Sequence, residues 1–334
     1  MATIKDISQL ANVSIASVSQ VLNGNYNNVS NDTKERILKV AKDLKYRPNR
    51  LARGLVKNET SIIGLIVPDI SNMYYAEIVK GVEEEAGKNA YQVILCNTSE
   101  DHRIERKQVN MLLEYNATGL IICGSEGYDL HSIELLQMHN IPLVTLDRKV
   151  DFGVTFDSNS LQGSLLSAAY LIEMGHTKIG FIGGGLGNTS PCGRRMGFLQ
   201  ALEKFDIPQR NSLYKIGHYN IKTGYQCTKQ LLEDKEDFTA LSCANDLIAF
   251  GAIKAIHEHG LRIPADLSLV GYDDIFLASS FEPELTTIRQ DSYTLGKDMV
   301  TELIQIISDG DNKKKTRYIE PELIVRKSVR RLKA

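Results

Sequence analysis

The sequence lacks the hallmarks of a secreted or membrane-spanning protein. No stretch approaches the ~18 consecutive apolar residues of a membrane helix, and the chain begins with the polar MATIKDISQL rather than with the pattern of a signal peptide. Cysteine is scarce, odd in number and mostly placed within apolar runs, at Cys96, Cys123, Cys192, Cys227 and Cys243. This usage favours reduced, buried thiols over disulfides. We therefore expect a cytoplasmic protein without a membrane partner.

Net charge is also nearly absent, at −2 for 334 residues, but the charges are unevenly distributed. Residues 1–60 hold ten Lys/Arg against five Asp/Glu, a net charge of +5, whereas the remainder holds 29 against 36, a net charge of −7. Hydrophobic residues (43%) and charged residues (24%) occur in the proportions of a globular protein. A small basic head on an acidic body predicts that the head contacts a polyanion.

The basic head carries the pattern of three helices. The expected N-caps are Thr3, Ser14 and Ser30. The apolar residues expected to face inward are Ile7, Leu10, Val18, Val21, Leu22, Ile37, Val40, Ala41 and Leu44. Two short helices separated by a tight turn and followed by a longer helix match a helix-turn-helix. The alternative is a small helical bundle without a ligand, which the basic charge disfavours.

At this point a family resemblance is visible. The stretch TIKDISQLANVSIASVSQVLNG, followed by VSNDTKERILKVAKDLKYRPNRLARGL, resembles the DNA-binding head of the lac/gal repressor family. The resemblance implies that the second helix enters the major groove of double-stranded operator DNA, with Ile15, Ala16 and Gln20 facing the bases. The two apolar side chains favour thymine methyl groups, and a glutamine suits adenine. Candidate phosphate contacts, each also compatible with a cap or a solvated side chain, are Ser14, Ser17, Ser19, Asn23 and Asn31.

The segment YRPNRLARGLVKN follows the head. Pro48 ends the third helix and predicts a short helix over residues 49–57, in which Leu51 and Leu55 share one face. The resemblance identifies this segment as a hinge helix, with Leu55 inserted between base steps in the minor groove. The other residues expected to contact DNA here are Asn49, Arg50, Ala52, Arg53 and Lys57. The alternative is a linker whose leucines rest on the body.

From residue 61 the pattern changes to apolar strands alternating with amphipathic helices. Strands are expected at 62–67, 91–96, 118–123 and 141–146, and in a second series at 178–183, 239–244 and 267–272. Two such doubly wound α/β units predict a bilobed body with a cleft between the lobes. The basic run 311–317 is expected to be a surface loop.

The body resembles the fold of periplasmic sugar-binding proteins, which implies three chain crossings between the lobes, near 158–161, 290–292 and 320–323. The expected domains are therefore a helix-turn-helix at 1–46, a hinge helix and linker at 47–60, and an effector-binding and dimerisation domain at 61–334. Within that domain, the N-terminal lobe comprises 61–160 plus 291–321, and the C-terminal lobe comprises 161–290 plus 322–334.

Polar and aromatic side chains follow the predicted strands, where ligands of open α/β sheets bind. Carboxylates, guanidinium groups and amides around tyrosine rings suit a polyhydroxyl ligand. The resemblance to ribose-binding proteins and ribose-operon repressors favours ribose and selects Asn72, Tyr74, Tyr75, Asp147, Arg148, Arg194, Tyr219, Asn245, Asp273 and Gln290. Phenylalanine is usual where Tyr74 and Tyr75 stand, so the sugar's identity stays open. No phosphate-cradling loop, metal cluster or activated nucleophile is recognisable, so we expect neither cofactor, metal nor enzymatic activity.

The sequence therefore predicts a sugar-responsive transcription repressor that binds a palindromic operator as a homodimer. Two alternative functions make different demands on the sequence. A global catabolite regulator of the same family would respond to a phosphorylated carrier protein instead of a free sugar. A sugar-binding transport protein would carry a signal peptide and no basic head.

Overall fold

The structure, a computed structural model, describes residues 2–22, 24–26, 29–46, 60–124, 130–184 and 190–332. The chain divides into two compact units, a head of Met1–Thr60 and a body of Ser61–Ala334. The predicted hinge helix and Asn23 lie outside the described residues. In the part of the chain that is described, no helix is long and apolar enough to cross a bilayer.

The head is the three-helix unit that the sequence predicts, with α1 (Ile4–Ala11), α2 (Ile15–Leu22) and α3 (Asn31–Asp43). Thr3 and Asp6 form a capping box at the start of α1, in which each side chain bonds the other residue's backbone N–H. The core consists of Ile7, Ala11, Val18, Val21, Ile37 and Ala41.

One inward assignment in the head is wrong. Leu10 is 64% exposed. The buried stripe of α1 runs through Ile7 and Ala11, one turn apart, and Leu10 lies about 100° around the helix from Ala11.

The N-terminal lobe is built on a six-stranded, all-parallel sheet in the order β11-β5-β4-β3-β1-β2. Its strands are β1 (Ile62–Val67), β2 (Gln92–Asn97), β3 (Gly119–Cys123), β4 (Leu143–Leu146), β5 (Val154–Asp157) and β11 (Lys315–Tyr318). Its helices are α5 (Met73–Lys88), α6 (His102–Glu114), α7 (Leu130–Met138) and α12 (Ser292–Asp309). Separate apolar cores form with α5 and α12 and with α6 and α7. The sheet is thus covered on both faces, as a doubly wound fold requires.

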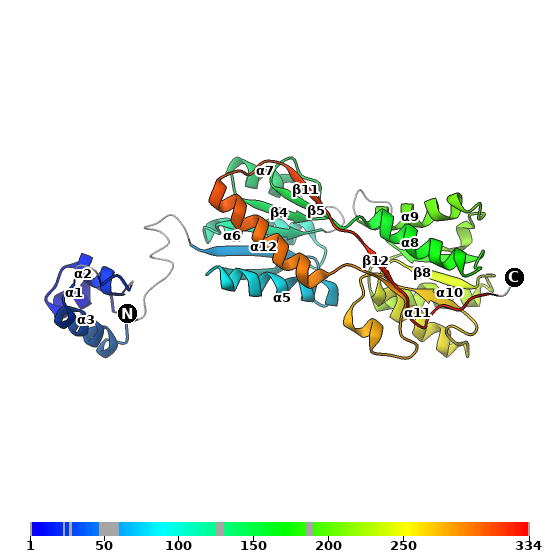
Figure 1. The fold of residues 1–334 in the computed structure, drawn as a ribbon, viewed down its shortest axis with the longest axis horizontal. Coiled ribbons are helices and arrows are strands. Elements are labelled where there is room, and N and C mark those ends of the chain that lie inside the picture. Colours follow the sequence, from blue (N-terminus) through cyan, green and yellow to red (C-terminus); the bar gives the residue numbers. More distant parts are fainter. Residues whose placement is uncertain are drawn as a thin grey trace. The chain divides into compact units, whose positions relative to one another are not determined.

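The C-terminal lobe contains a four-stranded parallel sheet in the order β7-β6-β8-β9. Its strands are β6 (Ile179–Gly183), β7 (Tyr214–Ile216), β8 (Ala240–Cys243) and β9 (Ser268–Val270). Its helices are α8 (Ser160–Glu173), α9 (Ser190–Lys204), α10 (Ile221–Glu233) and α11 (Asp246–Glu258), with the short 3-10 helices η1 (Asn211–Leu213) and η2 (Phe276–Ser279). Figure 1 shows α8 and α9 packed together on one side of this sheet and α10 and α11 on the other.

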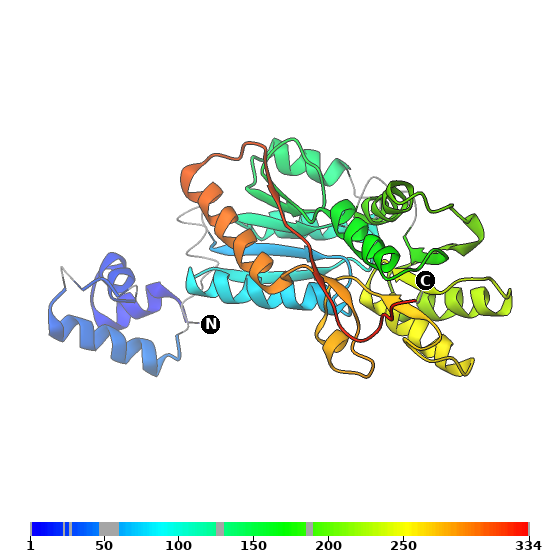
Figure 2. The ribbon, with the colours of Figure 1, turned by 45° about the vertical axis from the view of Figure 1, so that its right-hand side comes forward.

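Three segments connect the lobes. The first joins β5 to α8, the second joins β10 (Thr287–Arg289) to α12, and the third joins β11 to β12 (Glu322–Ile324). β10 and β12 pair antiparallel with each other, so the second and third segments run side by side. In Figure 2 the segment that includes β12, drawn in red, runs from the N-terminal lobe across to the C-terminal lobe.

The expectation of a loop at 311–317 is wrong in part. Residues Lys315–Tyr318 form β11, the edge strand beside β5. All four residues of β11 are exposed. Since β11 contains no run of buried apolar residues, it lacks the pattern on which the seven expected strands were predicted.

Candidate functional site

The first candidate site is the outward face of α2 in the head. Ser14 directly precedes this helix, and its Oγ accepts a hydrogen bond from the backbone N–H of Ser17 at 3.0 Å. Ile15 and Ala16 are exposed, and Ser19 and Gln20 are half-buried. Because Val18 and Val21 fill the core from the other side of the helix, this face presents the four predicted side chains together. Asn31, the first residue of α3, is also exposed.

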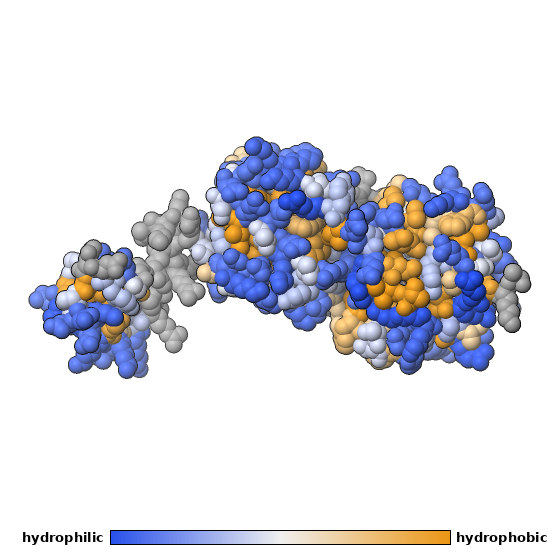
Figure 3. Space-filling view, in the orientation of Figure 1, coloured by the Kyte–Doolittle hydropathy of each residue, from blue (hydrophilic) through white to orange (hydrophobic). Residues whose placement is uncertain are grey.

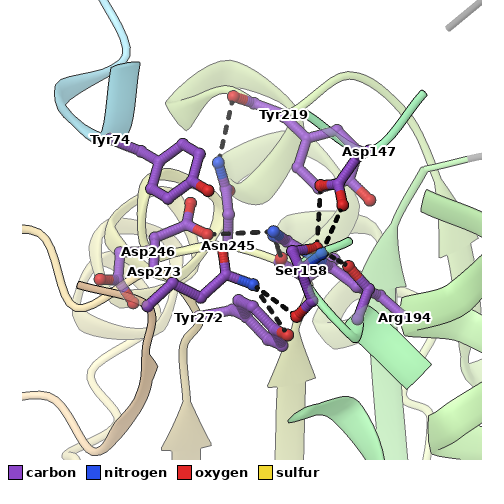
Figure 4. Close-up of polar contacts among 12 residues, drawn as sticks. Tyr74, Asp147, Ser158, Arg194, Tyr219, Asn245, Asp246, Tyr272 and Asp273 are labelled. Atoms are coloured by element: carbon purple, nitrogen blue, oxygen red, sulfur yellow. Dashed lines mark hydrogen bonds and ion pairs between the residues drawn. The ribbon is translucent and has the colours of Figure 1, made fainter. Parts of the chain in front are cut away.

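The second candidate site lies between the two lobes of the body. Eight of the ten residues predicted to bind an effector come together there: Tyr74, Tyr75, Asp147, Arg194, Tyr219, Asn245, Asp273 and Gln290. Figure 4 shows most of these side chains, which reach a common space from α5, from the end of β4 and from the C-terminal lobe. We call this space the interlobe site.

A hydrogen-bond chain links Asp147 to the first two lobe crossings. The Asp147 carboxylate accepts from the backbone N–H and from the Oγ of Ser158, both at 2.8 Å. The carbonyl oxygen of Ser158 accepts from Nε2 of Gln290 at 3.3 Å, and this amide also donates to Oη of Tyr272 at 3.3 Å. Burial raises the pKa of Asp147, although the Ser158 hydrogen bonds oppose the shift.

An ion pair between Arg194 and Asp273 forms the C-terminal side of the interlobe site. Nη2 of Arg194 lies 3.1 Å from Oδ1 of Asp273, its Nη1 donates to the carbonyl of Ala244, and its guanidinium lies 3.9 Å from the centre of the Tyr272 ring. Burial raises the pKa of Asp273 to about 6, against the opposing effect of Arg194. Burial by itself would lower the pKa of Arg194, but Asp273 and the neighbouring tyrosines raise it above its usual value. The arginine is therefore a permanent cation, while Asp273 is a carboxyl that titrates near neutrality.

Three buried polar atoms in the interlobe site have no hydrogen-bond partner among the described residues: Oη of Tyr74, Nε of Arg194 and Oε1 of Gln290. Buried polar atoms in native structures are almost always paired, so each of these three atoms is open to a partner beyond the described residues, such as a bound ligand. The hydroxyl can donate or accept, the guanidinium donates and the amide oxygen accepts. This set suits a small ligand that carries both donors and acceptors.

The tyrosine rings of α5 line the N-terminal side of the interlobe site. Tyr74 and Tyr75 contact each other edge-on, with ring centres 5.2 Å apart, and Oη of Tyr75 donates to the carbonyl of Gly124 at 3.4 Å. Burial raises the pKa of both hydroxyls well above the usual value, and the carboxylates of Asp147 and Asp273 add to that effect. Both tyrosines are therefore neutral at physiological pH and act as hydrogen-bonding, aromatic surfaces.

Two of the predicted amides also have a structural role. Oδ1 of Asn72 caps α5 by accepting from the backbone N–H of Tyr74 at 3.1 Å. Oδ1 of Asn245 caps α11 in the same way, from the N–H of Ile248 at 2.9 Å, and its Nδ2 reaches the carbonyl of Tyr219 at 3.4 Å. Each of these amides thus spends one hydrogen bond of its oxygen on a helix cap, and its remaining donors and acceptors are open to a ligand.

The structure places Arg148 outside the interlobe site. Its guanidinium forms a bidentate ion pair with Glu105 of α6, at 2.8 and 2.7 Å, and its side chain is only 1% exposed. Asp147, directly after β4, has a φ of +54°, so the chain leaves the extended conformation there and the Arg148 side chain is directed toward α6. The assignment of Arg148 as an effector contact is therefore replaced by a role inside the N-terminal lobe.

Sequence reasoning missed three residues that hold the interlobe site in place: Ser158, Asp246 and Tyr272. The carboxyl of Asp246 is fully buried and accepts from Oγ1 of Thr287 at 2.6 Å and from the N–H of Ile275 at 2.9 Å. Burial raises its pKa well above the usual value, with a further contribution from Asp273. Asp246 and Tyr272 stand at the ends of predicted strands and Ser158 at the predicted first crossing, so each had a positional signal in the sequence although none was selected as an effector contact.

Comparisons with known proteins cover both units of the chain. Residues 3–49 match the model of bacterial regulatory proteins of the lacI family, and residues 168–329 match the periplasmic binding protein-like domain. The transcriptional repressor PurR of Haemophilus influenzae is 39% identical over 99% of both chains. Among solved structures, the Lac repressor dimer bound to operator and an anti-inducer is 28% identical, covers 98% of this chain and 99% of that one, and has a TM-score of 0.85. A lacI-family regulator from Enterococcus faecium with bound ribose is 27% identical, covers 81% of this chain and all of that one, and has a TM-score of 0.74.

Proposed function

This chain belongs to the lacI family of bacterial regulatory proteins and is a DNA-binding transcriptional repressor, and we propose that a pentose in the interlobe site controls its binding to a palindromic operator. Members of this family are repressors that bind operator DNA as dimers and respond to a small molecule, and they are not enzymes. Such a repressor acts in the cytoplasm, where its operator lies.

The observation that carries the proposal is the set of buried polar atoms without a partner. Oη of Tyr74, Nε of Arg194 and Oε1 of Gln290 offer a mixed set of donors and acceptors to a ligand that itself donates and accepts. A sugar does this with each of its hydroxyl groups, and the carboxylates of Asp147 and Asp273 add acceptors for vicinal hydroxyls. Ribose is the favoured sugar, supported by the solved relative that binds it.

A purine base is the second candidate. The curated relatives that match the whole chain are repressors named PurR. The rings of Tyr74, Tyr75 and Tyr219 provide flat surfaces against which a planar heterocycle would stack. A base presents a fixed pattern of donors and acceptors, so it and a sugar would use the unpaired atoms differently.

Calorimetric titration of the full-length protein distinguishes these ligands. The panel contains D-ribose, other pentoses, hexoses, their phosphates and free purine bases. We expect binding of a pentose, and Asp147→Asn should weaken it at least about tenfold because a charged hydrogen-bond acceptor is lost. Asp151→Asn is the matched control, since Asp151 is an exposed residue of the same lobe that pairs with Lys314 on the surface. If the protein binds purine bases and no sugar, the pentose proposal is wrong and a purine base is the effector.

The second measurement is operator affinity with and without the bound ligand. A saturating amount of the pentose should change this affinity, on an operator chosen by selection from random DNA. A response to a phosphorylated carrier protein and to no small molecule would instead identify a catabolite regulator. Binding of a sugar without any effect on DNA would refute the proposed control.

The homodimer has a candidate contact surface on the C-terminal lobe. Phe276 and Phe281 are exposed, and the ring of Phe281 lies edge-on to Phe250 of α11, with ring centres 6.3 Å apart. Figure 3 shows apolar side chains gathered on this lobe. Exposed aromatic residues of this kind mark surfaces that bind other proteins, and a second copy of the chain would cover them.

A further inference from the structure

Asp274 follows the effector contact Asp273 but takes no part in the interlobe site itself. Its carboxylate is held by two arginines, with Oδ2 at 2.8 Å from Nε of Arg289 and Oδ1 at 2.7 Å from Nη2 of Arg326. The Asp274 side chain is 7% exposed and that of Arg326 is 12% exposed, whereas that of Arg289 is 44% exposed. We call these three residues the crossing clamp.

The two arginines of the crossing clamp come from the segments that connect the lobes. Arg289 ends β10, directly before the second crossing, and Arg326 lies two residues after β12, which follows the third crossing. Arg289 also pairs with Glu322 of β12, at 3.5 Å, and Arg326 donates to the carbonyl of Leu285 at 2.8 Å. One carboxylate therefore ties two of the three crossing segments to a single turn.

The same turn carries the ligand contact. Asp273 has a backbone φ of +105°, which a non-glycine residue rarely adopts, and Asp274 has a φ of +53°. The N–H of Asp273 donates to the carbonyl of Ile288 in β10 at 2.8 Å. On the other side, Ile275 packs into the apolar core of the N-terminal lobe. A turn in an uncommon conformation persists only when its surroundings hold it, and here the Ile288 hydrogen bond and the packing of Ile275 supply that hold independently of the crossing clamp.

We propose that Asp274 is a positioning residue that couples a ligand on Asp273 to the lobe crossings. The inference rests on the proposed control of the repressor by a small molecule in the interlobe site. A ligand that engages Asp273 displaces or fixes the 273–274 turn, and the crossing clamp transfers this change to β10 and β12. Without the crossing clamp the ligand still binds, but a change in the 273–274 turn no longer moves β10 and β12.

The test compares Asp274→Asn with Asp266→Asn in the full-length protein. Asp266 is a matched control because it pairs with Arg262 on the surface of the same lobe, far along the chain from both crossings. Ligand affinity is measured by calorimetry with D-ribose and guanine as probes, and operator affinity by fluorescence anisotropy with and without each probe. We expect Asp274→Asn to keep ligand affinity within about threefold while its operator response falls from about tenfold or more to less than about threefold. Asp266→Asn should keep both values.

A double-mutant cycle separates coupling from simple damage to the fold. Arg289→Gln removes the more exposed cation, so it is expected to fold even if Asp274→Asn does not. The operator response of the double variant should equal that of Asp274→Asn alone, because Arg289 acts through Asp274 and its further pair with Glu322, which lies outside the clamp, is exposed and 3.5 Å long. Additive losses, or a full response in folded Asp274→Asn, would overturn the inference.

Different results would refute control of the repressor by a ligand and the coupling role of Asp274. If the unaltered protein binds a probe but shows no operator response, control by that ligand is wrong, and the coupling role of Asp274 is overturned with it. If the unaltered protein responds and Asp274→Asn responds equally, only the coupling role is overturned. An equal loss of ligand affinity and operator response in Asp274→Asn would show that the residue merely supports the interlobe site.

Discussion

Acidification should weaken ligand binding through one carboxyl group, that of Asp273. Burial raises its pKa to about 6, so the group is mostly ionised at pH 7 and mostly protonated at pH 5. A pentose hydroxyl that donates to the ionised carboxylate loses this acceptor when the group is protonated. With a pKa near 6 the affinity should be about tenfold lower at pH 5 than at pH 7, with most of the loss below pH 6.

The stability of the fold should change in the opposite direction over the same range. Because the folded state raises the pKa of Asp273 above its usual value, the folded state binds the proton more tightly than the unfolded state does. The resulting contribution, up to about 3 kcal/mol for a shift of this size, is fully present below the unfolded-state pKa and is lost as the pH rises through about 6. Protonation of Asp273 therefore weakens ligand binding without destabilising the protein.

The assay is calorimetric titration with D-ribose between pH 5 and pH 8, accompanied by thermal melting at each pH. Asp273→Asn should bind about 10- to 100-fold more weakly at pH 7, since a hydrogen bond to a charged group is lost, and its affinity should not vary with pH. Asp237→Asn, at an exposed position paired with Lys178, is the control and should keep the slope of the unaltered protein. A slope that persists in Asp273→Asn would refute the reasoning and assign the titration to another group, with Asp147 the first to test because burial raises its pKa too.

Two further predictions concern the core of the N-terminal lobe and the DNA-reading face. Glu105→Gln leaves the buried guanidinium of Arg148 without its counter-charge and should lower the free energy of unfolding by about 3 to 5 kcal/mol; a loss below about 1 kcal/mol by denaturant titration would contradict the importance of this pair. Gln20→Arg should shift the preferred base from adenine toward guanine at one position in each operator half-site. Unchanged sequences after binding-site selection would count against Gln20 as a base-reading residue.

The sequence was sufficient for the elements whose burial follows a local pattern. The strand at 62–67 was predicted at the bounds that β1 has, because IIGLIV is buried on both faces and is apolar throughout. β11 was missed because KTRY is exposed and polar. Its extended conformation depends on pairing with β5, which lies about 160 residues earlier in the chain. Edge strands of this kind are set by tertiary contacts rather than by composition.

In the interlobe site, too, some residues could be placed from the sequence and others depend on tertiary contacts. The rule that ligands bind beyond the carboxyl ends of parallel strands located Asp147 and Asp273 correctly in one space. The rule does not say to which face the next side chain points, and so it misplaced Arg148. Ser158 and Gln290, which are 132 residues apart, meet only because two lobe crossings lie next to each other. Such a contact cannot be predicted from the residues on either side of Ser158 or Gln290.

The positions of the unpaired atoms explain why a small ligand would change the shape of the body instead of merely occupying it. Oη of Tyr74 belongs to the N-terminal lobe, Nε of Arg194 belongs to the C-terminal lobe, and Oε1 of Gln290 lies on a crossing. A ligand satisfies all three only in one relative position of the lobes, so its contacts favour that position over others. At about 0.5 to 1.5 kcal/mol for each hydrogen bond, three bonds favour one lobe arrangement by roughly 2 to 4 kcal/mol. A difference of this size changes the ratio of two arrangements by about 30- to 1,000-fold, which overlaps the upper part of the roughly 5- to 150-fold range typical of allosteric coupling.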